Sequence, residues 1–244
     1  MKNWFDTWFN TPYYHLLYKN RNSDEAEFFL NNLLDYLKPD KNHKFLDVAC
    51  GKGRHAKMLH QLGFDTLGLD LAEESIQEAK KLSTEGLSFD VHDMRQVYAK
   101  ESFDYVFNLF TSFGYFEVQD DNLKTLKAVH QSLKSNGELV IDFMNADKVI
   151  RHLVAKDEKT LQGVHFIQQR RLENGIIIKD IEVIDEGETY GFQERVQALN
   201  ITDFETLLKA SGFEIRNTFG DYKLSPFDKE SSDRLIIHAK KLKP

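Results

Sequence analysis

The sequence predicts an α/β fold in which a mostly parallel, seven-stranded sheet carries helices on both faces and ends in an antiparallel strand. Apolar strands alternate with helical segments over residues 44–143, which is the rhythm of a parallel sheet. The last two strands, 213–219 and 233–240, are joined by a link that contains Pro226 and no helical periodicity. Because a parallel crossover needs a dozen or more residues and usually a helix, the final strand is expected to run antiparallel to its neighbour.

The individual elements follow from apolar spacing and from Gly and Pro stops. Apolar residues at helical spacing predict helices over residues 24–37, 54–62, 73–82, 119–134 and 202–211, with a short helix near 146–154. Short apolar runs predict parallel strands over residues 44–49, 64–69, 87–91, 103–110 and 138–143. Such sheets bind ligands at the carboxyl ends of their strands.

The pattern changes to that of antiparallel strands after the fifth strand. Glu173-Asn174-Gly175 separates two strand-like runs, and Asn-Gly is a strong hairpin signal. Three strands are predicted, over residues 164–172, 176–184 and 189–199. We therefore expect one domain spanning 1–244, with a helical cap over 1–40 and an inserted antiparallel lid over 160–200.

Composition narrows the classes of partner and compartment. The chain has 32 basic and 39 acidic residues and a net charge of −7, so it lacks a general attraction for nucleic acid and no such partner is expected. Its one cysteine, Cys50, permits no internal disulfide and suits a reducing cytoplasm. No apolar run reaches membrane-spanning length, and no signal peptide or metal site is expected. The oligomeric state stays open.

A glycine-containing turn after the first strand is the main functional signal. Gly51 and Gly53 allow the backbone to turn sharply and to approach a ligand closely, and the following helix offers unpaired N–H groups. With Ala56 and Asp70 these glycines also satisfy the NAD fingerprint. Asp47, near the end of the strand, favours a cationic ligand group such as an ammonium, because a carboxylate repels a pyrophosphate.

The stretch Leu46-Asp47-Val48-Ala49-Cys50-Gly51-Lys52-Gly53 resembles motif I of the class I methyltransferases that use S-adenosylmethionine (SAM). The resemblance extends over most of the chain and implies a Rossmann-like sheet with SAM as cofactor. It implies that Ala49, Gly51 and Gly53 line the methionine part of SAM, whose ammonium group pairs with Asp47. Cys50 is then a small residue of the turn and not a nucleophile.

Two further acidic residues follow strand ends. Asp70, with Leu71 beside it, can accept both ribose hydroxyls. The alternative is a cap of the next helix, and both roles can hold together. The resemblance implies that Asp93 accepts a hydrogen bond from the adenine amino group and that Met94 packs on the ring. For Asp93, a solvated loop acid is the alternative.

The segment Asn108–Phe116 matches the family's motif IV position beside the transferred methyl group, and Asn108 is placed in the cofactor site. It lacks the Asn/Asp-Pro-Pro-Tyr/Phe pattern of enzymes that methylate nucleobases, and resembles small-molecule methyltransferases of the aminosugar and glycine N-methyltransferase kind. The stretch from Tyr13 to Arg21 resembles their opening element. This implies that Tyr14, Tyr18 and Arg21 close over SAM and the acceptor, unless these aromatic residues only pack a helix.

Residues that could take a proton from the acceptor are chosen only by their position in the sequence. Tyr14, Tyr115 and His15 are the candidates for proton transfer. One of the lid arginines could hold an anionic group of the acceptor, or all of them could belong to a solvated sheet face: Arg170, Arg171 and Arg195.

These patterns together predict a SAM-dependent methyltransferase that acts on a small polar molecule, at nitrogen or oxygen, by in-line displacement. An NAD-linked oxidoreductase and a non-catalytic SAM-binding protein are the alternatives. Binding of SAM rather than NAD would exclude the first, and turnover of an acceptor would exclude the second.

Overall fold

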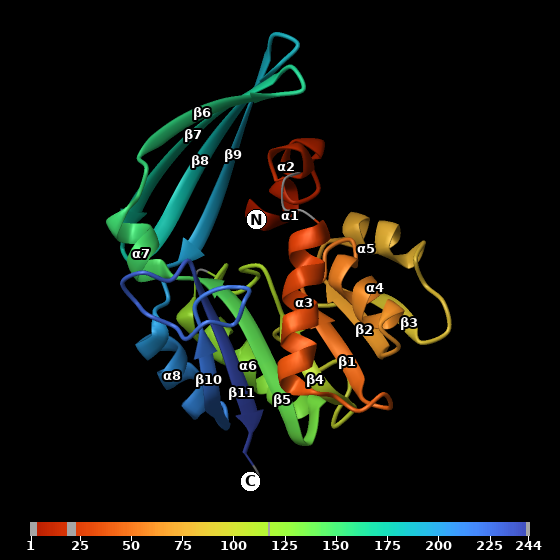
Figure 1. Cartoon of the computed structure of the whole chain (residues 1–244). Helices are drawn as coiled ribbons and strands as arrows, with labels where there is room; N and C mark the ends of the chain where they lie inside the picture. Colours follow the sequence, from red (N-terminus) through yellow and green to blue (C-terminus); the bar gives the residue numbers. More distant parts are fainter. Residues whose placement is uncertain (1–3, 19–22, 117, 243–244) are drawn as a thin grey trace.

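The computed structural model describes residues 4–18, 23–116 and 118–242, whose strands form two separate sheets (Figure 1). The larger sheet contains β1 (Lys44–Val48), β2 (Asp65–Asp70), β3 (Leu87–Val91), β4 (Phe103–Asn108), β5 (Leu133–Met144), β10 (Phe213–Phe219) and β11 (Arg234–Lys241). Across the sheet their order is β10-β11-β5-β4-β1-β2-β3. Strands β1 to β5 pair in parallel, whereas β11 is antiparallel to both of its neighbours. The predicted sheet with its reversed last strand is confirmed.

Helices cover both faces of this sheet, as Figure 1 shows. They are α3 (Ser23–Leu37), α4 (Arg54–Gln61), α5 (Glu73–Lys80), α6 (Gln119–Ser132) and α8 (Ile201–Ala210). Successive strand residues point to opposite faces, so Phe45 packs in one core cluster with Phe29 of α3, while Leu46 packs in another with Leu126 of α6 and Phe204 of α8. Burial of alternate residues on each face therefore holds the three layers together.

The strand order reverses between β1 and β4, which lie side by side although β2 and β3 separate them in the chain. In open α/β sheets the crevice at this reversal, beyond the carboxyl ends of the strands, is where ligands bind. The loops that follow β1, β2, β3 and β4 all lie at this edge, so the fold brings the four sequence motifs together.

The lid is a four-stranded antiparallel sheet, and the prediction of three strands was wrong. After α7 (Ala146–Arg151) it contains β6 (Lys156–Leu161), β7 (Val164–Glu173), β8 (Ile176–Asp185) and β9 (Glu188–Gln197), in that order across the sheet. The additional strand, β6, reads Lys-Asp-Glu-Lys-Thr-Leu and buries none of its residues. Pairing with β7 holds this strand in place. Its sequence has no apolar alternation from which a strand could be predicted.

The helices α1 (Trp4–Trp8) and α2 (Pro12–Leu17) lie beside the lid and above the central sheet (Figure 1). Trp8 and Leu17 are buried in a cluster with Phe166 and Ile181 of the lid strands. This cap therefore packs on the lid through its own small core. In the described part of the chain, no helix combines the length and the apolar character needed to cross a membrane.

Candidate cofactor and acceptor site

The turn after β1 adopts a left-handed backbone at Ala49, Gly51 and Gly53, with φ of 60°, 56° and 80°. A Cβ added at Gly51 would meet no protein atom within 4 Å, so this position opens onto free space. A Cβ at Gly53 would lie 2.4 Å from a ring atom of Phe89. The first glycine therefore leaves room for a ligand, whereas the second lets the turn pack against β3.

Asp70, the last residue of β2, is held toward the turn by backbone amides. Its Oδ2 accepts a hydrogen bond from Gly51 N at 2.7 Å, and its Oδ1 accepts one from Ala72 N at 2.8 Å. Burial raises the pKa of this carboxyl, and the amide hydrogen bonds work in the opposite direction. The N-cap of α5 is Ala72. Asp70 is therefore not the capping residue that the alternative interpretation expected.

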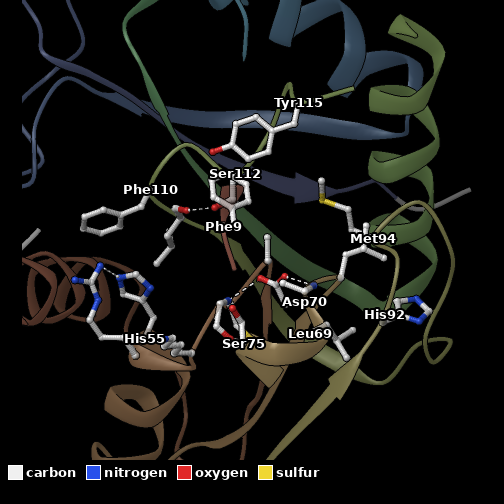
Figure 2. A pocket seen from close by; sticks show the side chains of 18 of the residues that line it. Phe9, His55, Leu69, Asp70, Ser75, His92, Met94, Phe110, Ser112 and Tyr115 are labelled. Atoms are coloured by element: carbon white, nitrogen blue, oxygen red, sulfur yellow. Dashed lines mark hydrogen bonds between the residues drawn. The ribbon is translucent and has the colours of Figure 1, made fainter. Parts of the chain in front are cut away.

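Asp93 follows β3 and forms an ion pair with Arg95, whose Nη2 lies 2.6 Å from its Oδ2. Partial burial raises the pKa of Asp93, but hydrogen bonds from the side chain and the backbone of Arg95 outweigh this and hold the pKa below its usual value. Arg95 also contacts Asp121 at the start of α6 at 2.7 Å and lies over the Phe116 ring. The guanidinium thus orients this carboxylate, while Met94 beside it faces the cavity (Figure 2).

A cavity of about 350 Å³ joins these segments. Of the predicted site residues, those that line it are Tyr14, His15, Tyr18, Ala49, Gly51, Asp70, Leu71, Asp93, Met94 and Tyr115. Figure 2 shows Asp70 near the middle, Met94 and His92 on one side, and His55 and Phe110 on the other. The structure therefore brings together residues from four strand ends and from the cap.

Three predicted site residues are absent from the described cavity lining: Asp47, Gly53 and Asn108. Burial raises the pKa of Asp47 to about 7, and its Oδ2 has no hydrogen-bond partner among the described residues. Asn108 is buried and donates to Val48 O at 3.1 Å, which ties the end of β4 to that of β1. Asn108 and Gly53 therefore fix the turn through their contacts with β1 and β3.

The cap closes one side of the cavity and is tied to the lid by hydrogen bonds. Tyr18 OH donates to Glu194 of β9 at 2.6 Å and accepts from Lys179 Nζ of β8 at 2.7 Å. Trp8 Nε1 also donates to Glu194, at 2.7 Å. Arg21 lies outside the described residues. The closure predicted for this segment thus includes a polar connection from Tyr18 to the inserted sheet.

The segment after β4 forms the wall nearest the cap. Phe110 and Thr111 both have positive φ, which ends the strand at Asn108 instead of at 110 as predicted. Tyr115 donates its hydroxyl hydrogen to Thr111 O, and its ring contacts Phe9 with centroids 5.6 Å apart. Phe9, Tyr14 and Tyr115 therefore form an aromatic boundary of the cavity.

Comparison with known proteins identifies the family. A model described as "Methyltransferase domain" matches residues 39–209, which is more than half of the chain. The chain belongs to this methyltransferase family. An NAD-linked oxidoreductase is thereby excluded.

Relatives of this methyltransferase cover nearly its whole length. It is 28% identical over 217 residues to a putative methyltransferase YqeM from Bacillus subtilis, covering 84% of the chain and 86% of the relative. A glycine/sarcosine N-methyltransferase from Aphanothece halophytica is 29% identical over 237 residues, covering 91% and 83%. The fold is similar to that of a SAM-dependent methyltransferase from Clostridium acetobutylicum, with a TM-score of 0.81, 21% identity and coverage of 95% and 96%. This methyltransferase therefore has the fold of SAM-dependent methyltransferases.

The lid arginines of this methyltransferase are engaged within the lid. Arg170 pairs with Asp157 at 2.6 Å, Arg171 pairs with Asp180, and Arg195 donates to Gln193 at 3.2 Å. All three are missing from the described lining of the cavity. Arg171 is exposed and belongs to the solvated sheet face that the sequence analysis gave as the alternative. The cations that line the cavity come from outside the lid.

Those cations are Lys52 and Arg54, which sequence reasoning did not single out. Both belong to the glycine turn and the start of α4, so their position next to Gly51 and Gly53 was the signal that could have found them. Arg54 lies over the Phe110 ring at 4.8 Å, which places it on the side of the cavity formed by the segment after β4. His55 was missed as well, and burial followed by repulsion from Arg54 lowers its pKa to about 3.

Proposed function

We propose that this methyltransferase moves the methyl group of SAM to the amine nitrogen of a small molecule that also carries a carboxylate. The observation that carries the proposal is the position of Arg54. Its guanidinium lies over the Phe110 ring and lines the cavity. Figure 2 shows Phe110 on the opposite side of the cavity from Met94, and we assign the Phe110 side to the acceptor. A guanidinium binds a carboxylate with two parallel hydrogen bonds.

The described residues fit SAM in shape and in hydrogen-bonding chemistry. Asp70 would accept the ribose hydroxyls with the lone pairs that its two backbone amides leave, beside Leu71. Asp93 and Met94 would hold the adenine edge and face, and the missing Cβ of Gly51 would leave room for the methionine part. We assign Asp47, Gly53 and Asn108 to support of the turn. Ala49, Tyr18 and Arg21 remain proposed contacts of the amino-acid tail.

SAM supplies a methyl group on a sulfonium, whose thioether leaving group needs no proton. The chain has to align the acceptor and exclude water, which together can contribute about 7–11 kcal/mol. Tyr14 and Tyr115 would do so as rings, together with Phe9, because all three border the cavity. The Tyr115 hydroxyl donates to Thr111 O, so it serves as an anchor of the wall.

An amine attacks only as the neutral base, and we assign the removal of its proton to His15. His15 lines the cavity from α2. Burial, followed by repulsion from Lys52, lowers the pKa of its imidazole, so the ring is neutral and able to accept a proton near pH 7. Substitution of His15 by Gln should therefore lower kcat most at low pH, where a larger fraction of the amine is protonated.

The test is transfer of labelled methyl from SAM to four acceptors: glycine, sarcosine, ethylamine and catechol. We expect turnover of glycine or sarcosine, at least tenfold lower kcat/KM for ethylamine, which lacks the carboxylate, and none for catechol. Methylation of catechol alone would refute an amine acceptor. Equal kcat/KM for glycine and ethylamine would refute the carboxylate.

A pair of variants on α4 tests the role of Arg54. Arg54→Gln should raise the KM for glycine at least tenfold and reduce the preference over ethylamine. Lys57→Gln removes one positive charge from an exposed position of the same helix, away from the cavity lining, and should leave both values within twofold. A larger change in the dissociation constant of S-adenosylhomocysteine than in the KM for glycine would assign Arg54 to the cofactor instead.

A further inference from the structure

Two consecutive residues after β4, Phe110 and Thr111, have φ of 58° and 59°. This left-handed region disfavours side chains with a Cβ, and a bulky residue and a β-branched residue are unusual there. Such conformations persist only where surrounding groups hold them, and they cluster at functional sites. Phe110 lines the cavity, so its backbone conformation sets one wall of the acceptor region.

A buried ion pair on the neighbouring strands holds this turn. Asp142 of β5 is fully buried, and its Oδ1 accepts from Arg234 Nε of β11 at 2.8 Å. Its Oδ2 accepts from Phe110 N at 2.9 Å, and its backbone oxygen accepts from Thr111 N at 2.8 Å. Arg234 Nη2 donates to Thr111 Oγ1 at 3.0 Å. Both members of the pair thus bond to the strained residues as well as to each other.

Further contacts transmit this placement to the cavity. The Phe110 ring packs between His55, with centroids 4.9 Å apart, and Tyr222, with centroids 5.5 Å apart. Tyr222 OH in turn donates to Asp142 Oδ2 at 3.2 Å. Thr111 O accepts the hydroxyl hydrogen of Tyr115. If the turn relaxed to negative φ, the Phe110 ring and the Tyr115 anchor would both move.

We propose that Asp142 and Arg234 are positioning residues that hold the Phe110–Thr111 turn in its left-handed conformation and so place the acceptor wall for methyl transfer. The proposal rests on the proposed function insofar as that function assigns this wall to the acceptor. An ion pair that served only stability would need no bonds to the turn. Here the pair supplies an acceptor for Phe110 N and a donor for Thr111 Oγ1.

The test combines Asp142→Asn with Thr111→Gly, because glycine adopts positive φ without the steric cost. Asp142→Asn alone should lower kcat/KM for the amine acceptor at least tenfold and change the dissociation constant of S-adenosylhomocysteine less than threefold. Its crystal structure with S-adenosylhomocysteine should show negative φ at Phe110 or Thr111. Adding Thr111→Gly should restore positive φ and most of the lost kcat/KM, which a merely structural pair would not permit.

Asp104→Asn is the matched control, because Asp104 also pairs with a cation, Lys134 at 2.7 Å, but at the opposite end of β4. It should leave kcat/KM within twofold. Should Asp142→Asn fail to fold, Arg234→Lys keeps the charge and removes the fork that reaches Thr111 Oγ1, so a smaller loss with the same rescue is expected.

Positive φ at both residues in the unrescued variant, or no recovery with glycine, would overturn the proposal. If none of the amines is methylated, the proposed function fails, while the φ values still decide whether the pair holds the turn.

Discussion

Substitution of Asp70 by Asn should weaken the binding of S-adenosylhomocysteine about 100-fold while leaving the protein folded. The carboxylate accepts from Gly51 N at 2.7 Å and from Ala72 N at 2.8 Å, one bond to each oxygen. Asparagine keeps one oxygen, but its NH₂ group would face an amide N–H that needs an acceptor. The cradle around the ribose therefore loses one bond to a charged acceptor and gains a donor–donor contact.

The size of the effect follows from the strength of these bonds. A hydrogen bond to a charged group contributes about 1.5–3 kcal/mol. Loss of one such bond to a ribose hydroxyl, at about 2.7 kcal/mol, corresponds to a 100-fold change in the dissociation constant. Because Asp70 lines the cavity, water can reach the freed amide, and we expect the free energy of unfolding to fall by only about 1–2 kcal/mol.

The assay is isothermal titration of wild type, Asp70→Asn and a control variant with S-adenosylhomocysteine, with urea unfolding alongside. Asp90→Asn makes the same chemical change on the adjacent strand β3, at a half-exposed residue that pairs with Lys80 at 3.6 Å and is not part of the described cavity lining. The control should bind within twofold of wild type. Equal affinity of all three proteins would refute the assignment of Asp70 to the cofactor.

Three further outcomes follow from the contacts of the site. Burial raises the pKa of Asp47 to about 7, so the free energy of unfolding of the ligand-free wild type should fall by about 2–4 kcal/mol relative to that of Asp47→Asn as pH rises from about 4 through 7. A difference between the two proteins in urea unfolding that stays constant between pH 5 and pH 8 would contradict this. Gly53→Ala should lower the free energy of unfolding by at least about 2 kcal/mol, because its Cβ would lie 2.4 Å from a Phe89 ring atom at a φ of 80°, and Phe89→Leu should recover part of the loss in a chemical-denaturation series. Tyr18→Phe removes the hydroxyl bonded to Glu194 at 2.6 Å, so the KM for SAM should rise several-fold with kcat little changed, and an unchanged KM in steady-state kinetics would separate the cap from cofactor binding.

Much of the central sheet was predictable because its signals are local. Each strand that is buried on both faces is a run of apolar residues. The sequences of α6 and α8 have apolar residues at helical spacing. The reversed β11 followed from the absence of a crossover helix before it. By contrast, β6 is a charged edge strand whose partner alone defines it, and β5 begins at Leu133 instead of 138 because pairing with β4 continues through an irregular register.

The site was predictable in part for the same reason. Asp70 ends its strand, and Gly51 and Asp93 follow theirs within three residues, so the parallel sheet alone brings them to one edge. Lys52 and Arg54 stand beside the two glycines, but that position does not specify whether their side chains face the cavity or the solvent. Their facing the cavity depends on how α4 packs against the segment after β4.

Residue order alone therefore specified which backbone turns can approach a ligand and which acids accompany them, since glycine placement and strand ends are properties of neighbouring residues. Contacts between distant segments specified the rest: the closure of the cap through Tyr18 and Glu194, 176 positions apart, and the support of Phe110 by Asp142, 32 positions away. Hydrogen bonds of this kind depend on where packing places two strands or helices, and a pattern along one stretch of chain does not contain that information.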